Sequence, residues 1–69
     1  SSTQLFIETP YRNQVMLEAI LKNCRLETRL CVAVNLTGPG ESIHTKTIAE
    51  WRKAVPDLKK QPAIFLLQA

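Results

Sequence analysis

The 69-residue chain has few of the residues that build cross-links, metal centres or membrane anchors. Its only cysteines are Cys24 and Cys31, too few for a disulfide scaffold, and the single His44 does not complete a tetrahedral zinc site with them. No apolar run approaches the roughly 20 residues of a membrane span, and no basic segment followed by an apolar one opens the chain. We therefore expect a soluble, cytoplasmic protein with no metal and no membrane partner.

Groups for nucleophilic catalysis are scarce as well. His44 falls on an expected edge strand and has no evident serine or cysteine partner. Cys31 sits inside an apolar run, where a small buried hydrophobe is the expected role, and a reactive thiol needs an electropositive, partly exposed setting. The sequence therefore assigns no catalytic residue.

Charge of one sign is not concentrated anywhere in the chain. Nine basic against six acidic residues give +3, and no run of like charge exceeds two. This mild excess would suit an anionic partner, although scattered lysines and arginines more often form a solvated surface. A hydrophobic fraction of 45% with 22% charged residues indicates a packed core, and the length leaves room for a single domain over residues 1–69.

The hydrophobic pattern predicts the order β-α-β-β-α-β. A strand is expected over residues 4–8, followed by a helix over 11–23 that Thr9 caps and Pro10 begins. In that helix Val15 belongs to the predicted apolar stripe and Asn13 to the side facing water. The run "RLCVAVNL" reads as a strand buried on both faces, and the turn Gly38-Pro39-Gly40 separates it from "ESIHTKT", whose Lys and His suit an edge strand.

The second half of the chain predicts one more helix and one more strand. Thr47 and Glu50 have the spacing of a capping box. The helix after Thr47 is expected to bury Ile48, Trp51 and Val55 and to end near Pro56, and "AIFLL" forms the last strand. We expect an α/β (α+β) fold with a mixed sheet and helices packed on it.

A cluster of polar residues lies at the junction between the expected first strand and first helix. Residues 8–13 there include Glu8, Thr9, Tyr11 and Arg12. The carboxyl ends of strands in open α/β sheets are where ligands bind, and a helix N-terminus adds free N–H groups and partial positive charge. The cluster therefore predicts a ligand rim. The alternative is that Thr9 caps the helix and the other side chains are simply solvated.

Four segments of the sequence resemble one known family. The segments "LFIETPYRNQVMLEAIL", "TRLCVAVNLT", "IHTKTIAEW" and "QPAIFLL" follow the order and spacing of the carboxy-terminal half of the tetrapyrrole (corrin/porphyrin) methylase superfamily. They are most similar to the branch that includes the 16S ribosomal RNA ribose 2'-O-methyltransferases. The residues at the four motifs are Glu8-Thr9-Pro10-Tyr11-Arg12, Val34-Asn35-Leu36-Thr37-Gly38, Thr45-Lys46-Thr47-Ile48 and Pro62-Ala63.

This resemblance implies the carboxy-terminal subdomain of an S-adenosyl-L-methionine-dependent methyltransferase. The intact enzyme would bind that cofactor in a cleft between two α/β domains and methylate a tetrapyrrole carbon or an rRNA ribose hydroxyl. The resemblance places Glu8, Arg12 and Lys46 against the substrate. It places Thr9, Pro10 and Tyr11 near the adenosine or methionine part of the cofactor. The same cleft would be lined, largely through backbone groups, by Val34, Asn35, Pro62 and Ala63.

Two departures from the family pattern bear on activity. Val34, Asn35 and Gly38 replace the charged residues of the family's Arg-Glu-Leu-Thr-Lys-like motif. The family's glycine-rich cofactor loop belongs to its amino-terminal domain, and nothing similar occurs in this sequence. We therefore expect this piece alone to be inactive and to bind the cofactor weakly, because half of a cleft cannot enclose a small ligand.

Without the resemblance, the same element order is the split pattern of ferredoxin-like domains. Such a domain could be a regulatory or oligomerisation module, in which case a homodimer is expected, or an RNA-binding module. RNA binding on a sheet needs exposed stacking aromatics. The strand aromatics Phe6 and Phe65 both lie in runs that read as buried.

Overall fold

The computed structural model describes residues 3–7, 12–36, 38–58 and 60–68, and of residues 3–7 the backbone only. The predicted order of elements is confirmed. The elements are β1 (Thr3–Ile7), α1 (Asn13–Asn23), β2 (Arg29–Val34), β3 (Ser42–Thr47), α2 (Ile48–Lys53) and β4 (Ala63–Gln68). Neither described helix is long and apolar enough to cross a membrane.

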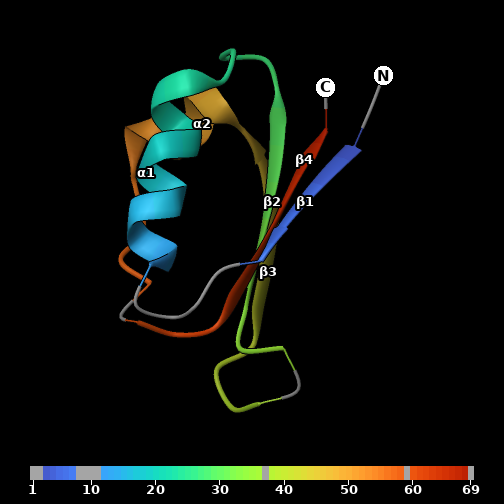
Figure 1. The fold of residues 1–69 in the computed structure, drawn as a ribbon, viewed down its shortest axis with the longest axis vertical. Helices are drawn as coiled ribbons and strands as arrows, with labels where there is room; N and C mark the ends of the chain where they lie inside the picture. Colours follow the sequence, from blue (N-terminus) through green and yellow to red (C-terminus); the bar gives the residue numbers. More distant parts are fainter. Residues whose placement is uncertain (1–2, 8–11, 37, 59, 69) are drawn as a thin grey trace.

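The four strands form one sheet in the order β1-β4-β2-β3, with both helices on the same face (Figure 1). Every neighbouring pair is antiparallel, so the expected mixed sheet is wrong. The chain contains two βαβ units, β1-α1-β2 and β3-α2-β4. The two strands of each unit run parallel but are not neighbours: β4 lies between β1 and β2, and β2 lies between β3 and β4. Parallel strands are therefore never adjacent, and the fold is α+β with two layers.

The sheet has two ends, which we call the hairpin end and the terminus end. At the hairpin end, β1 and β2 finish, β3 and β4 begin, and α1 starts (Figure 1). At the terminus end lie Thr3, Arg29, Thr47 and Gln68, which the register pairs across the strands. β3 is an edge strand, as its lysine and histidine predict.

The core lies between the helices and the sheet. The alternation of β2 sends Leu30, Val32 and Val34 to the helix side, where they are buried. On the opposite side Ala33 is buried but Cys31 is only half-buried. The expected full burial of both faces, and of Cys31, is therefore corrected, because both described helices lie on the other face (Figure 1). The remaining core residues are Leu17, Ile20, Leu21, Ile48, Trp51, Leu58, Ala63 and Phe65.

The first helix begins later than the sequence predicts. Arg12 occupies the N-cap of α1, without a side-chain cap, and the helix starts at Asn13. The expected cap at Thr9 and start at Pro10 are therefore corrected for α1, and those two residues lie outside the described part of the chain. Asn13, expected to face water, is buried at 0% exposure. Helical periodicity explains this, because Asn13 is four residues before the core residue Leu17.

Two valines differ from their predicted burial. Val15 is 59% exposed because it lies two residues, about 200° around the helix, from the buried Asn13. Val55 is 46% exposed because α2 already ends at Lys53. The capping box that begins α2 is confirmed: the Glu50 N–H donates to Thr47 Oγ1 at 3.2 Å, and the Thr47 N–H donates to Glu50 Oε1 at 2.9 Å.

Candidate functional site

The hairpin end of the sheet brings together two of the segments predicted to contact a cofactor. Val34 and Ala63 are register partners in adjacent strands, and the Asn35 N–H donates to the Pro62 carbonyl oxygen at 2.9 Å. Val34 is 8% exposed and Ala63 4%, and both side chains belong to the core. Their side chains are therefore not accessible to a ligand at this end of the sheet.

Asn35 turns the chain at this end. Its φ of 54° lies in the left-handed region, which asparagine tolerates better than most residues. Its carbonyl oxygen accepts from the Gly38 N–H at 3.0 Å, and Gly40, at φ 79°, completes the reversal that leads into β3. The loop that follows β2 is thus held at the rim of the sheet beside Pro62.

The first turn of α1 clamps the loop that leads into β4. Gln14 Nε2 donates to the Pro56 carbonyl oxygen at 3.0 Å, and Gln14 Oε1 accepts from the Leu58 N–H at 2.9 Å. Asn13 Nδ2 donates to the Gln61 carbonyl oxygen. These three bonds span more than 40 residues of sequence. They fix the backbone immediately before Pro62.

Asn13 also holds an unsatisfied acceptor. Its Oδ1 atom is buried and has no hydrogen-bond partner within the described part of the chain. Rotating the amide would not help, because the oxygen would then face the Gln61 carbonyl. A buried acceptor left unpaired costs about 1–3 kcal/mol. Burying Asn13 at the start of α1 therefore lowers the free energy of unfolding by an amount of this order.

The residues predicted to hold substrate do not share one end. Glu8, Thr9, Pro10 and Tyr11 lie outside the described residues. Arg12 is exposed at the start of α1, at the hairpin end. Lys46 pairs with Leu30 near the terminus end. Along β2, Leu30 is four residues from Val34, which separates Lys46 from the hairpin end by about 13 Å.

Lys46 belongs to a second polar group around the start of α2. Its Nζ lies 4.7 Å from the centroid of the Trp51 ring, in a cation–π contact. The backbone and side-chain hydrogen bonds from Thr47, with further attraction from Lys46 and Lys53, lower the pKa of Glu50. A shallow hollow of about 320 Å³ lies here. Its lining residues are Arg29, Thr45, Lys46, Thr47 and Glu50.

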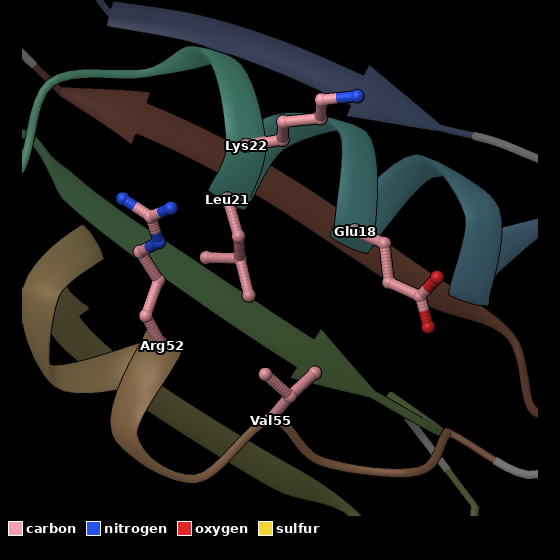
Figure 2. A pocket seen from close by; sticks show the side chains of 5 residues that line it. All are labelled: Glu18, Leu21, Lys22, Arg52 and Val55. Atoms are coloured by element: carbon pink, nitrogen blue, oxygen red, sulfur yellow. The ribbon is translucent and has the colours of Figure 1, made fainter.

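A second hollow, of about 220 Å³, lies between the two helices (Figure 2). Leu21 of α1 and Val55 point toward each other and form its apolar floor, while Arg52 reaches up from α2. The Glu18 carboxylate and the Lys22 ammonium extend away from that floor in Figure 2.

Sequence reasoning missed the clamp residues Asn13, Gln14 and Gln61. A signal was available for Asn13, because it stands on the helical face shared by Leu17 and Ile20. No local pattern pairs Gln14 with a loop 42–44 residues away. Among the described residues, no group of three His, Cys, Asp or Glu side chains is placed to hold a metal ion.

No family model matches the chain, and a search of curated proteins returns no match.

Proposed function

We propose that this chain is one lobe of an S-adenosyl-L-methionine-dependent methyltransferase related to the tetrapyrrole methylases, and that its hairpin end forms one wall of the cofactor cleft. The observation that carries the proposal is the hydrogen bond from the Asn35 N–H to the Pro62 carbonyl oxygen. It joins two segments that the family resemblance assigns independently to the same cofactor. β1, which leads to residues 9–11, the third segment that the resemblance assigns to the cofactor, also ends at the hairpin end.

The hairpin end fits a wall rather than a complete binding site. Among its described residues, the Asn35 N–H and the Pro62 carbonyl oxygen already bond each other and the Asn35 carbonyl oxygen accepts from Gly38, while Arg12 is an exposed cation at this end. A small cofactor needs 70–90% of its surface enclosed. One edge of a sheet cannot supply this, so binding by the chain alone should be weak, with a dissociation constant of about 1 mM or higher.

The methyl acceptor would lie along the sheet rather than at one point. Arg12 is at the hairpin end, and Lys46 is about 13 Å away along the strands. Two cations this far apart cannot grip one phosphate, but they can hold an extended anion. An rRNA strand and a tetrapyrrole with peripheral carboxylates both remain candidate substrates. Phe65 is fully buried and cannot stack on a base, which weakens the alternative of an RNA-binding sheet.

The proposal is tested by titrating the ¹⁵N-labelled protein with S-adenosylmethionine up to about 5 mM, several times the expected dissociation constant, and following amide shifts by NMR. We expect the amides of Asn35 and Ala63 to move, and those of Arg52 and Lys53 on the far side of the helix layer to stay. Adenosine and methionine alone serve as ligand controls. Shifts confined to the inter-helix hollow, or none at all, would overturn the proposal.

A matched pair of variants sharpens this test. Gln14→Ala removes both bonds to the loop before β4 and should reduce the cofactor-induced shift at Ala63. Lys22→Ala lies on the same helix at an exposed position away from the clamp and should leave the shift unchanged. Equal effects of the two variants would mean that the loop is not part of the cofactor wall. Binding at micromolar affinity would contradict the view that half of the cleft is missing.

A further inference from the structure

β3 is an edge strand whose outer side is covered by no other strand of the described sheet. Its register with β2 is one-to-one from Ser42 to Thr47, without a bulge, and it contains neither proline nor glycine. Such an edge presents N–H and C=O groups with which another strand can pair. Lys46, the residue expected to protect the edge, lies on the helix side of the strand, with its Nζ 4.7 Å from the centroid of the Trp51 ring.

One hydrogen bond shows which backbone groups of β3 point outward. The Ile48 N–H donates to the Thr28 carbonyl oxygen at 2.8 Å, which continues the pairing with β2 by one residue beyond the end of β3. In an antiparallel pair, residues that bond to the neighbouring strand alternate with residues that do not. The even-numbered residues of β3 therefore bond to β2, and Ile43, Thr45 and Thr47 direct their N–H groups to the outer side.

Glu50 occupies the last of these outward positions. The Thr47 N–H donates to Glu50 Oε1 at 2.9 Å, and Thr47 Oγ1 donates to the same oxygen at 3.2 Å. The carboxylate thus accepts the bond that the carbonyl oxygen of an added strand would accept. The hydrogen bond from the Thr47 backbone is also the largest cause of the lowered pKa of Glu50, so the side chain stays ionised at neutral pH.

We propose that Glu50 protects the open edge of β3 against strand addition, because its carboxylate takes up the outward N–H of Thr47. The capping box then has two roles: it starts α2, and it leaves only the outward amides of Ile43 and Thr45 for pairing. Without Glu50, the released Thr47 amide can pair with β3 of a second copy. A two-fold axis through Thr45 places Thr47 of each copy opposite Ile43 of its mate.

Three variants of the capping box test this by sedimentation equilibrium from about 10 μM to 1 mM. Glu50→Ala removes the protecting carboxylate and should self-associate at least about tenfold more tightly than the wild type. Thr47→Val is the matched control, because it removes the hydroxyl that accepts the Glu50 N–H but keeps the bond from the Thr47 N–H to the carboxylate. Glu50→Gln keeps an acceptor oxygen. These last two variants should associate no more than the wild type.

NMR locates the contact. In ¹⁵N-labelled Glu50→Ala, raising the concentration should shift the amides of Ile43, Thr45 and Thr47 and leave those of β1, at the opposite edge, unchanged. Hydrogen exchange of the wild type tests the geometry without any variant: the Thr47 amide should have a protection factor at least about tenfold higher than that of Thr45.

Four results would each overturn the proposal. They are a Glu50→Ala variant that associates no more than the wild type, equal association of Thr47→Val or Glu50→Gln, concentration-dependent shifts at β1 instead of β3, and a wild-type Thr47 amide no better protected than that of Thr45.

Discussion

Replacing Asn13 by aspartate tests whether this buried side chain holds the fold together at the hairpin end. The substitution keeps size and shape but removes the donor that bonds the Gln61 carbonyl oxygen. Losing a net hydrogen bond and leaving a buried carbonyl unpaired costs about 1–3 kcal/mol. An ionised carboxylate at a site with 0% exposure adds several kcal/mol more.

The sum is large relative to the stability that a chain of this size can have. At about 0.05–0.15 kcal/mol per residue, 69 residues supply roughly 3–10 kcal/mol. Asn13→Asp should therefore lower the free energy of unfolding by about 3–5 kcal/mol at pH 7 and leave a measurable unfolded fraction. Urea titration followed by far-UV circular dichroism measures this directly.

The pH dependence identifies the cause. Burial raises the folded-state pKa of the introduced carboxyl above its unfolded value of about 3.9. The folded state then binds the proton more tightly, so the variant regains stability as pH falls toward 4 and loses it as pH rises through the folded pKa. Protonation also restores a donor toward Gln61.

Asn23→Asp is the matched control for this prediction. Asn23 also donates from Nδ2 to a backbone carbonyl, that of Ala19 at 2.8 Å, but it is exposed at the end of α1. Its substitution should cost less than about 1 kcal/mol and show no recovery at low pH. If Asn13→Asp is no more destabilising than Asn23→Asp, the clamp does not contribute to folding and the reasoning fails.

Three further substitutions probe the core and the start of α2. Phe65→Ala, at 0% exposure, should cost about 3–5 kcal/mol in urea unfolding, and a cost under 1 kcal/mol would contradict the core assignment. Trp51→Phe keeps an aromatic ring but removes the 2.8 Å bond from Nε1 to the Leu30 carbonyl oxygen, and should cost about 1–3 kcal/mol; an unchanged urea midpoint would contradict it. Thr47→Ala removes the capping box and should cost about 1 kcal/mol near neutral pH. Because the folded pKa of Glu50 is lowered from its ordinary 4.5, the box stabilises above that value and is lost as pH falls through the folded pKa, so the variant and the wild type should converge in acid.

Local patterns determine much of this fold and explain which predictions held. The Thr47 and Glu50 spacing predicts the start of α2 because both partners of the capping box lie within one turn. The nearly continuous apolar run of β2 predicts a buried strand, and Leu30 and Val32 are buried, although the same run wrongly predicted full burial of Cys31 on the other face. Lys46 and its neighbours predict an edge strand because long charged side chains suit an edge.

The sheet order depends on contacts that no local pattern encodes. Nothing within β4 indicates that it separates β1 from β2, and this insertion is what makes every pair antiparallel. The burial of Asn13 was obscured for a different reason. Periodicity places it on the core face, but its polarity suggests solvent, and only the distant Gln61 carbonyl resolves the conflict.

Part of the candidate site follows from strand direction once the sheet order is known. Because β2 and β4 are antiparallel neighbours, the end of β2 and the start of β4 lie together at the hairpin end, where Asn35 and Pro62 meet. The same strand direction places Lys46, near the end of β3, toward the terminus end of the sheet. A motif in sequence carries no information on strand direction, so the resemblance grouped Lys46 with Arg12 although the sheet separates them.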